Sequence, residues 1–177
     1  PGRINREDVD ADKVLGAGMQ RTNQRIVTEL VKRYNALTPV QRELMIEGNF
    51  DEKKQLCYLA IAKSNLFIRE FIVEIVREKA LLYDLQLTDA DFGIFVNRKI
   101  PVHPELEEFT DNTINKARQT LFKILADADI IDSTALKQLK PQWLSDKVRD
   151  VIGSDNPEWL KIFLISDAEI EQTMKNL

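Results

Sequence analysis

The sequence predicts an all-α protein, and three observations support that prediction. Apolar-periodic runs follow one another from Asn49 to His103 without strand-like alternation. Residues that commonly cap helices recur between the runs. Glycine and proline number only 6 each, so long disordered tracts are not expected. We therefore expect a compact multi-helix domain with a set of short helices at its C-terminal end.

The length and composition suit a single globular body. The chain has 177 residues, of which 44% are hydrophobic and 31% are charged, an ordinary balance for a chain that buries a core. We expect three parts. Residues 1–20 form an arm or a short helix, with a flexible hinge at 16–18. Residues 21–130 form the main helical domain, and 131–177 form short helices packed on the same body.

The first two helices have clear boundaries in the sequence. The first is predicted over residues 22–36. Thr38 is expected to cap the second, with Pro39 in its first helical position and Gln41 completing a capping box. Gly48 is expected to end this helix, because glycine tolerates the left-handed conformation that often follows a last turn.

Two further helices are predicted in the apolar region. Asp51 is expected to cap the third, which runs to about residue 63. Ser64 or Asn65 is expected to cap the fourth, which continues to about residue 83. Its paired apolar residues repeat every four positions, which is typical of a central helix with several neighbours.

The remaining helices are predicted from their caps and breaks. Thr88 caps a short helix ending near residue 98, Pro101 interrupts the chain, and Thr110 caps a long helix to about residue 128. Apolar residues of the tail are expected to pin it to the main body. The expected caps of the short C-terminal helices are Ser133, Ser145, Asn156 and Ser166, and the pinning residues are Trp143, Trp159, Ile162 and Phe163.

Residue types that carry catalysis are scarce. Cys57 is the one cysteine, and its apolar neighbours predict a buried core thiol. His103 is the one histidine, so neither a usual zinc site nor a Ser-His-Asp arrangement is indicated. Asp89 and Asp91 fit the first turn of a helix, where negative charge is favoured. We expect no enzyme activity, no metal or other cofactor and no small-molecule substrate.

A membrane-spanning helix is not predicted either. The most apolar run, over residues 66–82, is interrupted by six charged side chains. A single cysteine fits a reducing compartment. We therefore expect a cytoplasmic protein without a membrane partner.

The charge pattern points to local basic surfaces on an acidic chain. The net charge is -4 and the calculated pI is about 5.2, so nucleic-acid binding would require segregated cations. The first helix offers such a face, since its polar positions fall on one side at about 100° per residue. Two more clusters occur around the long helix and around Trp143. The candidate phosphate-binding residues are Arg21, Gln24, Arg25, Thr28 and Lys32 on the first helix, Arg98, Lys99, Lys116 and Lys123 around the long helix, and Lys140 and Lys147 near Trp143. The ordinary alternative for each cluster is a solvated helix surface.

Several segments follow one another along the chain: RTNQRI at 21–26, QLCYLAIA at 55–62, FIREF at 67–71 with VREK at 76–79, LTDADF at 87–92, HPEL at 103–106 and TINKARQTLF at 113–122. Together they resemble the BrxA family of BREX bacteriophage-defence systems. They occur in the family's order and cover roughly residues 19–170. Cys57 departs from the pattern, since tryptophan is expected there.

The resemblance implies a small helical protein with a fold similar to that of NusB, an RNA-binding antitermination factor. It also implies a non-enzymatic accessory protein that binds double-stranded DNA and has other BREX proteins as partners. Together with the basic helix faces, this predicts DNA binding mainly through phosphates. Two alternatives remain: an adaptor that docks to other BREX proteins, and RNA binding by analogy with NusB.

Overall fold

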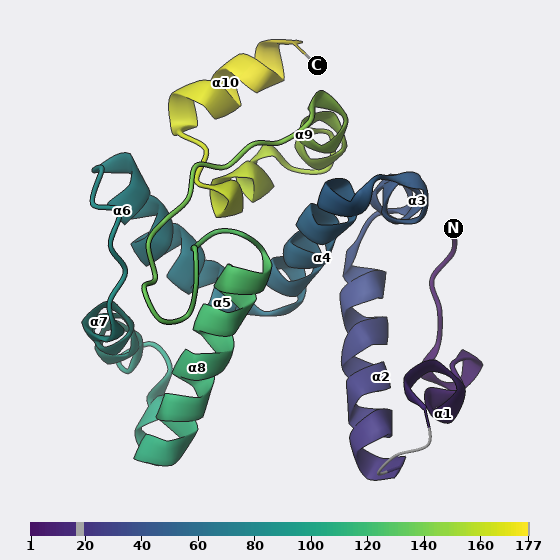
Figure 1. The fold of residues 1–177 in the computed structure, drawn as a ribbon, viewed down its shortest axis with the longest axis horizontal. Helices are drawn as coiled ribbons and strands as arrows, with labels where there is room; N and C mark the ends of the chain where they lie inside the picture. Colours follow the sequence, from purple (N-terminus) through teal and green to yellow (C-terminus); the bar gives the residue numbers. More distant parts are fainter. Residues whose placement is uncertain (17–19, 177) are drawn as a thin grey trace. The chain divides into compact units, whose positions relative to one another are not determined.

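The fold is known from a computed structural model, which describes residues 1–16 and 20–176. Figure 1 shows that these residues form helices joined by loops. The described residues include two isolated antiparallel bridges and no sheet. The all-α prediction is therefore confirmed, while the likeness to NusB stays a prediction. Of the predicted hinge, Ala17 and Gly18 lie outside the described residues.

Contacts between residues divide the chain into two compact units. Unit 1 covers Pro1–Asn65 and unit 2 covers Leu66–Leu177. This division rests on packing alone, so the arm, main domain and tail expected from the sequence stay a prediction.

Unit 1 consists of three longer helices and a short N-terminal segment that runs beside the first of them (Figure 1). Both α2 and α3 contact α4. Their interface buries apolar side chains, including Val27, Leu56 and Leu59. The elements are η1 (Arg6–Asp8), α1 (Ala11–Leu15), α2 (Gln20–Ala36), α3 (Pro39–Glu47) and α4 (Phe50–Ser64).

The predicted cap of α3 is confirmed, but the residue that caps α4 differs from the prediction. Thr38 and Gln41 form the expected capping box. At α4, the Asn49 side chain accepts a hydrogen bond from the Glu52 amide at 3.0 Å, and Glu52 accepts one from the Asn49 amide. Asp51, the predicted cap, lies in the first turn instead. Asparagine caps helices as well as aspartate does, so the box formed with Glu52 decides the start.

Gly48 ends α3 for a different reason from the one expected. Its φ is -62° and its ψ is 164°, an extended conformation rather than a left-handed one. A Cβ at this position would lie 2.6 Å from the carbonyl oxygen of Leu44. Close approach to the last turn therefore requires glycine here, not a positive φ.

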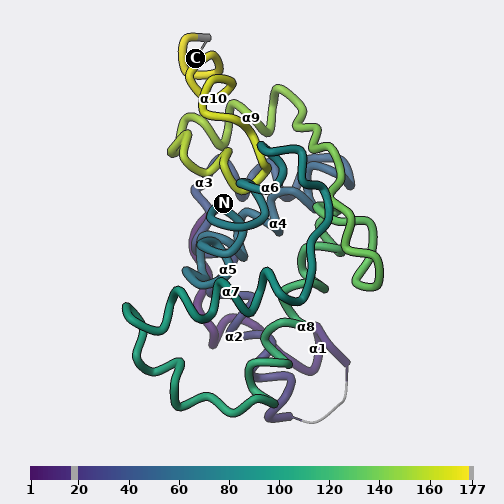
Figure 2. Tube along the Cα trace, turned by 90° about the vertical axis from the view of Figure 1, so that its left-hand side faces the viewer, coloured from purple at the N-terminus to yellow at the C-terminus, as the bar shows by residue number. Residues whose placement is uncertain are grey.

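Unit 2 is built around an aromatic core. The Phe71 ring lies 5.2 Å from that of Phe95 and 6.3 Å from that of Phe122, edge-on geometries that stabilise aromatic pairs. The segment joining α7 to α8 makes a wide excursion, visible in Figure 2. The elements are α5 (Leu66–Phe71), η2 (Ile72–Arg77), α6 (Glu78–Leu81), α7 (Asp89–Lys99), η3 (Pro104–Glu108), α8 (Asp111–Asp127), α9 (Asp146–Gly153), η4 (Pro157–Phe163) and α10 (Asp167–Asn176).

The predicted fourth helix is present but is not a uniform α-helix. The helical path runs through α5, η2 and α6, and η2 is a π-helix of six residues. Arg77, at its end, is only 4% exposed. Its Nε donates to the carbonyl oxygen of Ile165 at 2.9 Å, and its Nη2 lies 3.1 Å from Asp167. Arg77 therefore fastens this helix to the start of α10.

The tail matches three of the four predicted helix starts. Ser145, Asn156 and Ser166 each accept a hydrogen bond from a backbone amide of the helix that follows. Ser133 was wrongly predicted to start a helix, because a turn follows it. There the Asp132 side chain accepts from the Gln138 amide at 2.9 Å, which holds the chain in a tight loop.

The apolar residues of the tail are divided between core and surface. Ile162 and Phe163 are buried, as expected. Trp143 is 82% exposed, so the prediction that it pins the tail is wrong.

Candidate nucleic-acid interface

The predicted basic face of α2 forms as a continuous polar side of the helix. Positions 21, 24, 25, 28 and 32 share one side of an α-helix. All five side chains are exposed. The Thr28 hydroxyl donates to the carbonyl oxygen of Gln24 at 2.8 Å, so this hydroxyl can still accept a hydrogen bond.

Among the described residues, no carboxylate holds the cations of this face. Among the ion pairs formed by the described residues, none includes Arg21, Arg25 or Lys32. They therefore keep their hydrogen-bonding capacity for an anionic ligand.

A second element adds a cation that the sequence did not indicate. An open hollow of about 780 Å³ is lined by Arg6 of η1 together with Arg21 and Arg25. Glu7 and Glu29 also line it, so three cations face two carboxylates there. The N-terminal segment is held along α2 because Asn35 exchanges two hydrogen bonds with the backbone of Ile4, at 3.1 and 2.7 Å. No periodicity in the sequence signals this side-chain-to-backbone contact.

The side of α2 opposite this polar face is only partly buried. Val27 and Val31 are buried, whereas Ile26 and Leu30 are 41% and 45% exposed. Buried Asn23 instead occupies a core position, where its amide donates to Asp12 at 3.2 Å and to the carbonyl oxygen of Gly16 at 3.0 Å. These hydrogen bonds fix α1 against α2. They therefore also fix the orientation of the basic face of α2 within unit 1.

In unit 2, Lys99 is unsuited to phosphate binding. It is 8% exposed, and its Nζ lies 2.6 Å from Glu74 and 3.0 Å from Glu70. Burial alone would lower the pKa of Lys99, but the hydrogen bonds to the two glutamates raise it above its ordinary value. The two glutamates therefore occupy the ammonium group of Lys99.

The other predicted residues of unit 2 fall into two groups. Lys123 lies 3.3 Å from Asp127, and Lys140 lies 2.9 Å from Asp129. Such exposed pairs are weak and can rearrange. The second group is exposed and takes part in none of the ion pairs formed by the described residues. This group is Arg98, Lys116 and Lys147.

The two units carry opposite net charges. Residues 1–65 hold 11 lysines and arginines against 9 aspartates and glutamates, a net charge of +2. Residues 66–177 hold 14 against 20, a net charge of -6. The chain's cationic excess therefore lies in the unit that contains α2.

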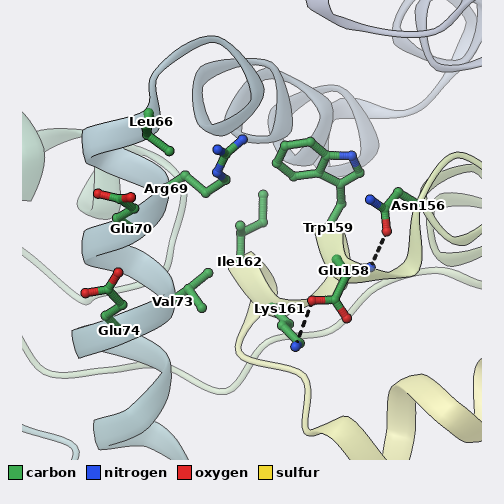
Figure 3. A pocket seen from close by; sticks show the side chains of 10 residues that line it. All are labelled: Leu66, Arg69, Glu70, Val73, Glu74, Asn156, Glu158, Trp159, Lys161 and Ile162. Atoms are coloured by element: carbon green, nitrogen blue, oxygen red, sulfur yellow. Dashed lines mark hydrogen bonds and ion pairs between the residues drawn. The ribbon is translucent and has the colours of Figure 1, made fainter.

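Unit 2 also contains a mixed pocket of about 360 Å³, shown in Figure 3. The Arg69 guanidinium lies 5.2 Å from the centre of the Trp159 ring, a cation–π contact. Glu158 on the opposite wall holds Lys161 at 2.8 Å. Glu70 and Glu74 hold Lys99, so each carboxylate that lines this pocket has a cationic partner.

Residue types suited to metal binding are dispersed. Across residues 1–16 and 20–176, no group of three or more His, Cys, Asp or Glu side chains could hold a metal ion. Cys57 is exposed, so its predicted burial in the core is wrong. Desolvation by neighbouring groups still raises the pKa of its thiol, against the opposing charge of Arg33. In the same part of the chain, no helix has both the length and the apolarity to cross a membrane.

The fold and the site define a small helical protein with an exposed cationic helix face. The BrxA family model matches residues 4–156, so the chain belongs to the BrxA family, and the predicted resemblance is confirmed. A protein of Escherichia coli O9:H4 (strain HS) named BREX protein BrxA is 25% identical over 146 residues, covering 82% of this chain and 68% of that protein. One of the same name from Bacillus cereus (strain H3081.97) is 24% identical over 123 residues, covering 70% of this chain and 62% of that protein.

A solved structure shares the fold. An uncharacterized protein from Magnetospirillum magneticum matches with a TM-score of 0.72 and 18% identity, over 87% of this chain and 80% of that one. The family match therefore makes this chain a BrxA-family protein of the BREX defence system.

Proposed function

We propose that this chain is a non-enzymatic accessory protein of a BREX system that binds double-stranded DNA, mainly through phosphates. The observation that supports this most is the exposed cationic face of α2, whose Arg21, Arg25 and Lys32 are in none of the ion pairs formed by the described residues. Lysine and arginine without carboxylate partners can replace the counterions that surround a duplex.

The geometry of the helix suits contact with a sugar–phosphate backbone. Arg21, Arg25 and Lys32 follow one side of α2, and the 11 residue steps from Arg21 to Lys32 span about 16.5 Å at 1.5 Å per residue. Gln24 and Thr28 lie between them and can add hydrogen bonds to phosphate oxygens. Contacts of this kind position a protein on DNA without reading its sequence, so we expect little sequence preference.

Charge reversal on this face tests the proposal. Arg25→Glu combined with Lys32→Glu should weaken binding to a labelled duplex by at least about tenfold at low salt, because two phosphate contacts are lost. The slope of log affinity against log salt should become shallower by about two. Fluorescence anisotropy measures both quantities, and circular dichroism checks that the helices remain. Unchanged affinity in the folded variant would reject this face.

The same assay separates duplex DNA from RNA. The α2 face carries exposed cations, but the aromatic platform on which single-stranded bases stack is not among its predicted residues. Unlabelled duplex DNA should therefore compete for the protein better than single-stranded RNA of equal length. Stronger competition by RNA would favour the RNA-binding alternative.

An adaptor role is the second candidate, supported by Trp143 at 82% exposure. Tryptophan is enriched among the residues that dominate protein interfaces. In this case Trp143→Ala should abolish co-purification with another BREX protein while leaving DNA affinity unchanged. Retained co-purification in this variant would argue against an interface at Trp143.

A further inference from the structure

An apolar groove lies within unit 1, lined by the N-terminal segment, α2, α3 and α4. Its volume is about 420 Å³. Buried Val27, Val31 and Ala60 line its depth, and Val14 at 58% exposure lies near its opening. A groove of this size and lining falls in the range of small-molecule sites.

The groove differs from the other hollows in how few charges line it. Charged side chains dominate the hollow beside Arg6, and several also line the Figure 3 pocket. In the apolar groove, Arg33 is the one charged residue among the described residues that line it. A ligand there would meet an apolar surface and a single cation.

Arg33 has unused hydrogen-bonding capacity. Its Nε is buried and has no hydrogen-bond partner among the described residues. None of the ion pairs of residues 1–16 and 20–176 includes Arg33, although Glu29 precedes it by one helical turn. A buried donor without a partner is destabilising, and an anionic group at the groove would satisfy it.

We propose that this groove binds a small amphiphilic anion, with its apolar body against Val27, Val31 and Ala60 and its acidic head at Arg33. A medium-chain carboxylate has the required chemistry. The charge complementarity comes from Arg33, and the apolar lining supplies most of the affinity. Arg33 is not one of the proposed DNA-binding residues Arg21, Arg25 and Lys32, although with Arg25 it lines a neighbouring hollow of about 440 Å³.

Cys57 provides a direct test, since it lines the groove, is exposed and is the one cysteine of the chain. The rate of its alkylation by iodoacetamide is measured on the full chain with decanoate or with decanol, its uncharged counterpart. Decanoate should slow alkylation at least about tenfold at saturation and should act at about tenfold lower concentration than decanol, the ratio for one charged hydrogen bond. No protection by either compound, or equal protection by both, would overturn the proposal.

Variants locate the head group. Arg33→Gln should raise the decanoate concentration needed for protection about tenfold and leave decanol unchanged, while Arg33→Lys should retain part of the preference. Lys32→Gln is the matched control, because it removes a neighbouring cation that does not line the groove. An equal effect of Arg33→Gln and Lys32→Gln would overturn the assignment.

A second measurement does not depend on the thiol. Cys57→Phe places a ring at an exposed position of the groove, where folding should tolerate it. Isothermal titration with decanoate should show binding to the unmodified protein and at least about tenfold weaker binding to this variant. Undiminished binding to the folded Cys57→Phe protein would contradict the groove as the site.

Discussion

Unit 1 and unit 2 use their basic side chains differently. On α2 of unit 1, Arg21, Arg25 and Lys32 extend into solvent outside every ion pair formed by the described residues. In unit 2, Lys99, Lys123 and Lys140 lie beside carboxylates, whereas Arg98, Lys116 and Lys147 take part in none of the ion pairs formed by the described residues. Helical spacing alone does not distinguish the two cases. The availability of a cation for phosphate depends on carboxylates that other segments bring to it.

The difference follows the charge of each unit. Unit 2 has six more acidic than basic residues, so a cation there has many possible partners, whereas unit 1 has two more basic than acidic residues. In unit 2 some of these contacts hold the fold together, and Arg77, at 4% exposure, is more buried than Lys99 at 8%.

Removal of the Arg77 guanidinium should cause the largest loss of stability. Arg77→Ala leaves the buried carbonyl oxygen of Ile165 without its donor and removes the contact with Asp167. We expect a loss of about 3 kcal/mol in the free energy of unfolding. Urea denaturation followed by tryptophan fluorescence measures it, because both tryptophans, Trp143 and Trp159, belong to unit 2.

Arg98→Ala serves as the matched control for that experiment. Arg98 is exposed and lies in the same unit, so its removal should change the free energy of unfolding by less than about 0.5 kcal/mol. Equal losses in the free energy of unfolding for Arg77→Ala and Arg98→Ala would show that the burial of Arg77 gives it no larger role in stability than the exposed Arg98.

Matched charge reversals in the two units should differ in their effect on DNA binding. The unit 2 double variant Lys123→Glu with Lys140→Glu should change affinity less than about twofold, because each lysine already has a carboxylate partner and the phosphate contacts lie elsewhere. The unit 1 double variant Arg25→Glu with Lys32→Glu should lose at least about tenfold. Anisotropy at one salt concentration compares them. Similar losses would mean that total charge, rather than the α2 face, governs binding.

A smaller effect is expected at the start of α4 in unit 1. Asn49→Ala removes the acceptor of the Glu52 amide and should lower the free energy of unfolding by about 1 kcal/mol. Asp51→Ala, at the cap position predicted from the sequence, should cost less, because that side chain accepts no capping bond. Thermal unfolding by circular dichroism ranks the two variants. A larger loss of stability from Asp51→Ala than from Asn49→Ala would mean that Asp51, the cap predicted from the sequence, is the residue that stabilises the start of α4.

Acid should weaken unit 2 through the carboxylates at the start of α10. The hydrogen bond and charge of Arg77 lower the pKa of Asp167, and the Ser166 hydroxyl lowers that of Glu169. A carboxyl whose pKa is lower in the folded state stabilises the protein above its unfolded pKa of about 4, and this stability is lost as the pH falls through the folded value. The melting temperature from tryptophan fluorescence should therefore fall below about pH 4.

Asp167→Asn should make that acid dependence shallower, since the variant cannot be protonated at this position. An unchanged slope would mean that other groups carry the acid sensitivity.

The candidate site was only partly predictable from the sequence. The exposed α2 face follows from 3.6-residue periodicity, which fixes the direction of each side chain once the helix forms. Arg6 could not be predicted, because its position depends on the bonds between Asn35 and Ile4. Lys99 has the same polar sequence context as Arg98, and its burial depends on Glu70 and Glu74 from another helical segment.

The sequence by itself determined the helices, most of their caps and the exposed cationic side of α2, because these depend on neighbours within about four residues. Tertiary structure alone decided which cations are held by carboxylates, why Gly48 must be glycine, and where an apolar groove opens beside Arg33. These features depend on contacts between groups from different segments, and local periodicity in the sequence does not predict such contacts.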